Sequence, residues 1–167
     1  NASEKDLEYI ENTTFIKPIV LYNRRSPKYS TVSVDDYNIG KVVALEFKKH
    51  NCHSTAIIAS ESVYAGMAER TDSYMKESQM NSIFVTDFIR TSNSITGGYE
   101  GGKQLLQQTT LPDCVFCISD AIAIGFLYAI NESNISVPGQ MKMISIGNGD
   151  RELEEFSMPA LSVVRIP

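Results

Sequence analysis

Residues 112–130, with the sequence P-D-C-V-F-C-I-S-D-A-I-A-I-G-F-L-Y-A-I, decide the fold of this chain. The first half holds a short apolar run at 115–118, with a proline before it and a polar pair after it, which is typical of a buried strand. Ser119 and Asp120 are helix-start residues, because their short side chains accept hydrogen bonds from the unpaired amides of a first helical turn. Apolar residues then recur at helical spacing. The stretch therefore predicts a strand that leads directly into a helix.

Asp120 lies at the junction between the expected strand and the expected helix. In an open α/β sheet, ligands bind beyond the carboxyl ends of the strands. A carboxylate at this junction either caps the helix or contacts a ligand. The stretch alone leaves both roles open.

The composition describes an ordinary globular piece of protein. The chain has 167 residues, of which 43% are hydrophobic and 21% are charged, enough for one domain with a sizeable core. The net charge of -5 gives this piece no electrostatic signature of nucleic-acid binding. No apolar run approaches the roughly 20 residues that a membrane span requires. The chain has no initiator methionine and no signal peptide, so we expect a cytoplasmic protein of which this is a fragment.

The three cysteines predict core thiols rather than a redox or metal site. An odd count without a secretion signal suggests reduced thiols. Cys114 and Cys117 match C-x-x-C by letter, but residues three apart in a strand point to opposite faces. His50, Cys52 and His53 form a loose metal-like cluster without a second ligand pair elsewhere in the sequence. We therefore expect no metal and no cofactor.

Apolar patterns along the chain alternate between strand and helix character. Strands are expected at 18–23, 31–35, 56–59, 81–86, 115–118, 141–146 and 161–166. Helices are expected at 4–12, from Asp36 to about residue 49, and at 70–76, 95–106, 120–130 and 151–156. Residues 60–69 are either a polar loop or a frayed helix start, and 87–94 is a polar loop. This alternation predicts an α/β fold with a parallel, doubly wound sheet.

Polar residues follow the expected strands, and their chemistry suits a polyhydroxylated ligand. Amides and carboxylates hydrogen-bond to neighbouring hydroxyls, and aromatic side chains such as Tyr22, Tyr37 and Phe88 can cover a sugar face. Each polar residue taken singly has the alternative role of a cap or a turn residue. The sequence has no glycine-rich nucleotide motif and no catalytic constellation, so an enzyme is not expected. The candidate positions are Asn23, Asp35, Asp36, Arg70, Asn93, Asp120, Asn148 and Asp150.

Eight collinear segments resemble the effector-binding region of the LacI/GalR bacterial transcriptional regulators. They run from about residue 16 to residue 167. The family patterns that they resemble are, in order, P-V-V-x-x-D-R at 18–24, V-D-N-x-x-G at 34–40, G-H-x-x-I-x-x-I from Cys52, R-x-x-G-Y at 70–74, G-Y-x-A-x-x-x-L-L at 98–106, F-x-x-N-D-x-x-A-x-G at 116–125, V-P-x-D-V-S-V-x-G-F-D from Val137, and P-P-L-T-T-V-x-Q from Met158.

The resemblance assigns ligand-binding roles to particular residues. The family's ligand arginine falls on Arg70, and its ligand aspartate falls on Asp120. Asn93 lies, by its spacing from Tyr99, where the family has an aromatic or polar ligand contact, and Phe88 is a rival for that position. Three other positions also belong to the site. Asn23 stands in place of the family's aspartate, Asp35 matches the family's aspartate, and Asp36 stands in place of its asparagine. These exchanges between acid and amide bear on which ligand is bound.

The resemblance also implies an organisation into subdomains. Residues 1–32 would be a remnant of the N-terminal subdomain, 33–162 the C-terminal effector-binding subdomain, and 163–167 the return crossover. Members of the family are homodimers that bind operator DNA through N-terminal helix-turn-helix heads, and this chain does not include such a head. The apolar surface of 122–130, with Leu153 and Phe156, is either the dimer contact or part of the core.

The function implied is a repressor domain that senses a sugar or sugar-like effector in the cleft between subdomains. Effector binding would shift the dimer between DNA-binding and non-binding states. A sugar-binding protein of a transport system is the alternative, because it shares this fold. An α/β enzyme is a third possibility, and it lacks a catalytic constellation in this sequence.

Overall fold

The computed structural model describes residues 4–24, 26–62, 65–147 and 151–166. The chain forms two compact units, Asn1–Asp35 and Asp36–Pro167. Each unit is described separately below.

The first unit contains a helix and a pair of short strands. Helix α1 (Glu4–Asn12) is followed by β1 (Val20–Tyr22) and β2 (Ser30–Val32), which pair in parallel. The ammonium group of Lys28 donates hydrogen bonds to the carbonyl oxygens of Glu11 and Thr13, at 2.7 and 2.8 Å. The hydroxyl group of Tyr29 donates to the carbonyl oxygen of Ile10 at 3.1 Å. These contacts fasten the loop before β2 to the end of α1.

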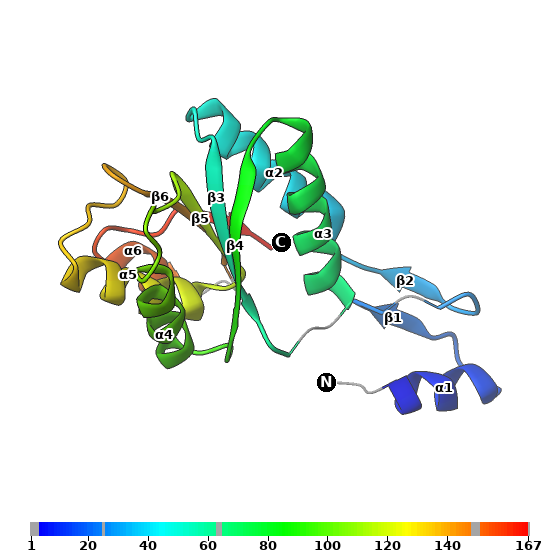
Figure 1. Ribbon diagram of the computed structural model, residues 1–167. Coiled ribbons are helices and arrows are strands. Elements are labelled where there is room, and N and C mark those ends of the chain that lie inside the picture. The colour runs from blue at the N-terminus through cyan, green and yellow to red at the C-terminus, as the bar shows by residue number, and fades with distance from the viewer. Residues whose placement is uncertain (1–3, 25, 63–64, 148–150, 167) are drawn as a thin grey trace. The chain divides into compact units, whose positions relative to one another are not determined.

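The second unit is built on a five-stranded, wholly parallel sheet (Figure 1). Its strand order is β4-β3-β5-β6-β7. The strands are β3 (Ser54–Ser60), β4 (Phe84–Thr91), β5 (Cys114–Cys117), β6 (Lys142–Gly147) and β7 (Val163–Arg165). The predicted α/β class with a parallel, doubly wound sheet is confirmed.

Two pairs of helices cover the two faces of this sheet. In Figure 1, α2 (Asp36–Lys49) and α3 (Ala65–Met80) lie on one side of β3 and β4, and α4 (Ile95–Leu105) and α5 (Asp120–Glu132) lie on the other. A short helix, α6 (Arg151–Phe156), precedes β7. Within the described residues, no helix is both long and apolar enough to cross a lipid bilayer.

The central strand β5 is buried along its whole length, as its apolar sequence predicts. On the face covered by α2 and α3, the ring of Phe116 packs on Tyr74 with centroids 4.7 Å apart. Tyr74 in turn meets Phe47 of α2 edge to face at 6.2 Å. This aromatic stack joins both helices to the middle of the sheet.

Two predicted boundaries are wrong. The expected loop at 87–94 is largely strand, because β4 continues to Thr91 and includes Phe88 and Arg90. Since β4 is the last strand in the order, its side chains are partly exposed and tolerate charge, which hides the apolar pattern of a buried strand. The helix expected at 70–76 extends further, to Met80, and it begins at Ala65, within the stretch where a frayed helix start was one of the two alternatives.

Helices α4 and α5 approach so closely that their contact requires glycine. A Cβ atom on Gly125 would overlap the carbonyl oxygen of Ile95, and one on Gly98 would overlap the carbonyl oxygen of Ile122. Each glycine lowers helix propensity by about 1 kcal/mol relative to alanine. The close approach of the two backbones offsets that cost.

Replacing Gly125 by alanine should therefore destabilise the chain despite the gain in helix propensity. We expect the free energy of unfolding in urea to fall by about 1–3 kcal/mol, as for overpacking of a core. Gly101→Ala in α4 is the matched control, because the added Cβ would meet only side-chain atoms, the nearest being a methyl group of Ile58 at 3.0 Å. Equal stability of the two variants would contradict the close contact between α4 and α5.

Candidate functional site

Arg70 and Asp36 form a buried ion pair between α3 and α2. The Nε atom of Arg70 donates to Oδ1 of Asp36 at 2.6 Å, and Arg70 is only 3% exposed. Asp36 is the first residue of α2, where a carboxylate also suits the positive end of the helix dipole. Both residues were predicted separately as ligand residues. The structure brings them together, so the aspartate holds the guanidinium in a fixed orientation.

Asn93 and Asp120 are connected through Ser119. The hydroxyl group of Ser119 donates to Oδ1 of Asn93 at 2.6 Å, and the hydroxyl oxygen of Ser119 accepts a hydrogen bond from the backbone amide of Ile122 at 3.3 Å. Ser119 is therefore the N-cap of α5. Asp120 is the first residue of the helix, and its Oδ1 accepts from the amide of Ala121 at 2.8 Å.

This arrangement bears on the two roles that the sequence left open for Asp120. The capping position is occupied by Ser119, which precedes Asp120. Sequence reasoning identified Ser119 as a helix-start residue but did not include it among the site residues. Its position directly after an apolar strand is the pattern that could have identified it. Ser119 thus fastens the predicted ligand amide of Asn93 to the start of α5, of which Asp120 is the first residue.

Asn23 and Asp35 belong to the first unit. Asn23 has a left-handed backbone (φ 51°), which asparagine tolerates better than most residues. Its side-chain oxygen accepts a hydrogen bond from the amide of Val34 at 3.1 Å, and its own amide donates to the carbonyl of Val32 at 2.8 Å. Asn23 therefore orders the turn after β1. Two other candidates, Asn148 and Asp150, lie outside the described residues.

Phe88 and Asn93 were the two candidates for one ligand contact, and the structure places them in different parts of the second unit. It lines a pocket of about 320 Å³ between α3 and the strands β3 and β4, and the guanidinium of Arg90 lies 4.9 Å from the centre of its ring. The pocket does not include Arg70, Asn93 or Asp120. Its lining residues are Ala59, Ser60, Met67, Ala68, Thr71, Asp72, Met75, Phe88, Arg90 and Ile118.

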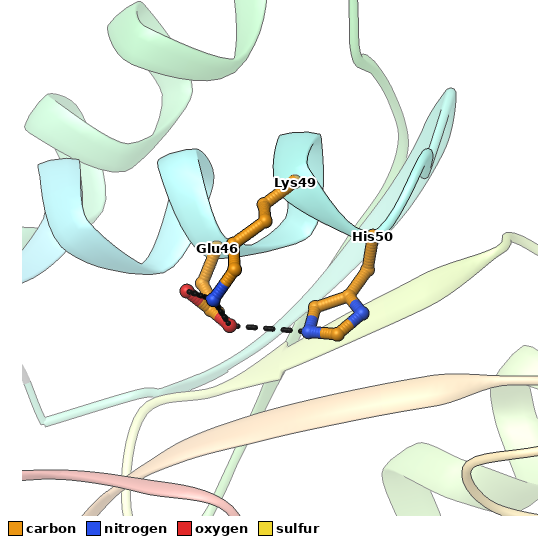
Figure 2. A network of polar contacts seen from close by, with 3 residues as sticks. All are labelled: Glu46, Lys49 and His50. Carbon is orange, nitrogen blue, oxygen red and sulfur yellow. Dashed lines mark hydrogen bonds and ion pairs between the residues drawn. The ribbon is translucent and has the colours of Figure 1, made fainter.

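The metal-like cluster of the sequence is separated in the structure. His50 contacts Glu46 one turn earlier, with 3.1 Å between Nε2 and Oε1, and Lys49 binds the same carboxylate (Figure 2). These contacts, that of Lys49 above all, lower the pKa of Glu46 below its ordinary value. Cys52 is buried, whereas His50 is exposed. Across the part of the chain that the structure describes, no three histidine, cysteine or acidic side chains are arranged to hold a metal ion.

Comparison with known proteins identifies the family of this fold. The family model of the periplasmic binding protein-like domain matches residues 44–167. A LacI family transcription regulator from Clostridium acetobutylicum superposes with a TM-score of 0.94 at 38% identity, covering 100% of this chain and 63% of that one. A LacI family regulator from Enterococcus faecium, solved with bound ribose, shares the fold at 19% identity, with a TM-score of 0.76 over 98% of this chain and 59% of that one.

Curated relatives match over parts of their length. The lactose operon repressor of Rhizobium radiobacter is 36% identical over 70 residues, which are 42% of this chain and 60% of that protein. The regulator GalR of Streptococcus thermophilus is 28% identical over 142 residues, which are 81% of this chain and 42% of that protein. The chain thus corresponds to about half the length of these relatives.

The chain belongs to the periplasmic binding protein-like domain family. The resemblance to the effector-binding region of the LacI/GalR regulators is confirmed by these matches. The relatives are named as regulators and repressors, which agrees with the expectation that the chain is not an enzyme.

The Arg70–Asp36 pair predicts a measurable stability difference. Asp36→Ala removes a charge-assisted hydrogen bond from a buried guanidinium and should lower the free energy of unfolding by about 1.5–3 kcal/mol. Asp36→Asn keeps an oxygen acceptor and should cost less. Glu46→Ala is the control, because it breaks an ion pair on the exposed side of the same helix and should leave the urea midpoint unchanged. A loss for Asp36→Ala no larger than for Glu46→Ala would show that the buried pair does not stabilise the fold.

Proposed function

We propose that this chain is the effector-binding part of a LacI/GalR-type transcriptional repressor and that its effector is a sugar or a sugar-like molecule. The observation that carries the proposal is the pairing of polar side chains beside the carboxyl ends of the parallel strands. Ser119 binds Asn93 where β5 gives way to α5, and Asp120 is the first residue of that helix. Arg70 and Asp36 are paired between the helices before and after β3. Relatives named for lactose and ribose operons support a carbohydrate effector.

The chemistry of these groups suits hydroxyl recognition. A carboxylate accepts hydrogen bonds from neighbouring hydroxyls, an amide both donates and accepts, and a guanidinium donates in a fixed fork. The contacts already formed within the site limit the rotation of the side chains. A ligand therefore meets groups whose orientation is largely set before it binds, which reduces the entropic cost of binding.

The proposed organisation places residues 1–32 in an N-terminal subdomain, 33–162 in the effector-binding subdomain and 163–167 in the return crossover. The separation of the chain into units at Asp35 and Asp36 supports a boundary near residue 33. The mechanism that follows is a population shift. Effector binding favours one closure of the two subdomains, and the closure changes the spacing of the DNA-binding heads of the complete protein.

A homodimer is part of the proposal, and the structure divides the predicted apolar surface into two parts. Ile122, Phe126 and Ile130 are buried in the core of the second unit. Tyr128, Leu153, Phe156 and Met158 are exposed. The side-chain amide of Asn131, at the end of α5, donates to the carbonyl oxygen of Met158 at 3.1 Å, which holds the two segments together. Exposed apolar clusters of this kind support a contact with a second copy.

Operator DNA is expected to bind through a helix-turn-helix head in the complete, cytoplasmic protein. The gene sequence before Asn1 tests this directly. A helix-turn-helix there supports the repressor, whereas an export signal would contradict it and indicate the sugar-binding protein of a transport system.

Asp120→Ala in the complete protein should weaken effector binding. The variant loses two carboxylate oxygens that accept from hydroxyls, which is worth about 1.5–3 kcal/mol for hydrogen bonds to a charged group. Titration with the sugar that releases wild-type protein from its operator gives the affinity. Glu132→Ala, at the other end of α5, is the control and should bind as wild type. An unchanged effector response in Asp120→Ala would remove Asp120 from the site.

Phe156→Asp should weaken the homodimer of the complete protein. A charge at this side chain, which is 80% exposed, would have to lose its hydration in an apolar contact between copies. Sedimentation velocity should show a monomer at concentrations where the wild type is dimeric. Phe84→Asp, a substitution at a side chain that is 74% exposed on β4, is the matched control and should remain dimeric. Loss of the dimer only in Phe84→Asp would place the interface on β4 instead.

A further inference from the structure

Two cysteines far apart in the sequence meet at the opposite edge of the sheet, where β3 and β5 begin. Cys52 follows α2, and its amide donates to the carbonyl of Phe47 at 3.1 Å. Cys114 is the first residue of β5 and pairs in register with Thr55 of β3. The side chains are 1% and 0% exposed, respectively.

The backbone around both thiols is fixed by one carboxylate. Asp113 Oδ2 accepts hydrogen bonds from the amides of His53 and Ser54, at 2.7 and 3.0 Å. The amide of Asp113 donates to the hydroxyl oxygen of Ser54 at 3.0 Å. The residue after Cys52 and the residue before Cys114 are thus fastened to one another, so the two thiols are held in a defined relation.

The thiols face the same buried space beside Tyr74. The hydroxyl oxygens of Tyr74 and Thr55 are hydrogen-bonded at 2.5 Å, and Thr55 is the register partner of Cys114. The thiol of Cys114 donates to the carbonyl oxygen of Ser54 at 3.4 Å. The thiols of Cys52 and Cys114 lie close enough that each alters the pKa of the other. Cys117, on the same strand, has no such thiol neighbour among the described residues.

The surroundings distinguish the two sulfur atoms. The neighbouring Cys114 lowers the pKa of Cys52 more than burial raises it, and the positive charge of Lys142 also lowers it. Burial raises the pKa of Cys114, and the neighbouring Cys52 raises it further. Cys52 therefore has more thiolate character, which is the form that attacks an oxidant.

We propose that Cys52 and Cys114 are an oxidation site that forms an intramolecular disulfide in the presence of a hydroperoxide. Cys52 first loses its proton, and the thiolate attacks one peroxide oxygen. The O–O bond breaks, and the departing hydroxide takes up the released proton and leaves as water, which gives a sulfenic acid on Cys52. The sulfur of Cys114 then attacks the sulfenic sulfur and forms the S–S bond. The sulfenic oxygen leaves as a second water with the proton of Cys114. Two thiols are oxidised, and one hydrogen peroxide is reduced to two waters.

The turn that carries Cys52 gives a small oxidant a route to the thiol. Asn51 and His53, which flank Cys52, are both exposed, and Asn51 has a left-handed backbone (φ 57°). An opening of this turn that breaks the hydrogen bond between the amide of His53 and Asp113 exposes Cys52, while β3, which begins at Ser54, stays paired. The proposal is independent of the effector site, which lies at the other edge of the sheet.

The test is oxidation of the purified, folded chain with hydrogen peroxide, followed by unfolding in denaturant, alkylation of the remaining thiols and peptide mapping without reductant. We expect the number of alkylatable thiols to fall from three to one. The peptides containing Cys52 and Cys114 should be joined with loss of two hydrogens, Cys117 should be alkylated, and dithiothreitol should restore all three thiols.

Variants distinguish this bridge from general oxidation. Cys117→Ser should form the same linked peptide pair, whereas Cys52→Ser should keep Cys114 alkylatable after peroxide, with circular dichroism used to show that each variant is folded. The wild-type peptide map decides the matter even where a variant does not fold. A bridge that includes Cys117, a sulfinic acid on Cys52 beside a free Cys114, or three unreacted thiols in the native chain would each overturn the proposal.

Discussion

The burial of β5 on both of its faces is the constraint on which the rest of the second unit depends. A parallel strand in the middle of a sheet has no solvated face, so it must be apolar throughout and covered by helices on both sides. The aromatic stack of Phe116, Tyr74 and Phe47 covers one face, and the closely packed pair α4 and α5 covers the other. Because all five strands run in parallel, their carboxyl ends meet at one edge. The topology of the sheet therefore places the polar residues that follow those strands near one another, before any contact between their side chains is considered.

The sequence predicted the parts of the fold where burial determines residue type. The strand at 114–117 and the helix after it were found because their apolar positions repeat with the period of a buried strand and then of a helix. The sequence predicted that the fourth strand ends at Thr86, whereas β4 continues to Thr91. An edge strand accepts Asp87 and Arg90 beside Phe88, so its pattern resembles that of a polar loop. The sequence left the start of α3 open between a loop and a frayed helix, since Ala65 to Glu69 has no strong helix-start residue.

For the candidate site, sequence reasoning named residues but not their partners. Arg70 and Asp36 were predicted as separate ligand residues, and their mutual ion pair depends on how α2 and α3 pack, which spacing along the chain does not encode. The same holds for Asn93 and Ser119, and for Cys52 and Cys114, which are separated by more than sixty positions. Local pattern gives the type of an element and the position of polar residues within it. Tertiary packing decides which of those residues touch.

The central claim is that a sugar effector binds at the carboxyl edge of this sheet. Hydrogen–deuterium exchange of the complete protein, followed by mass spectrometry with and without a bound sugar, tests it most directly. The account predicts slower exchange in the peptides that contain Arg70, Asn93 and Ser119–Asp120, since ligand contacts suppress local opening there. Peptides at the opposite edge, around Ser54 and Asp113, should be unchanged. Protection confined to that opposite edge, in the presence of a sugar that binds with measurable affinity, would contradict the account.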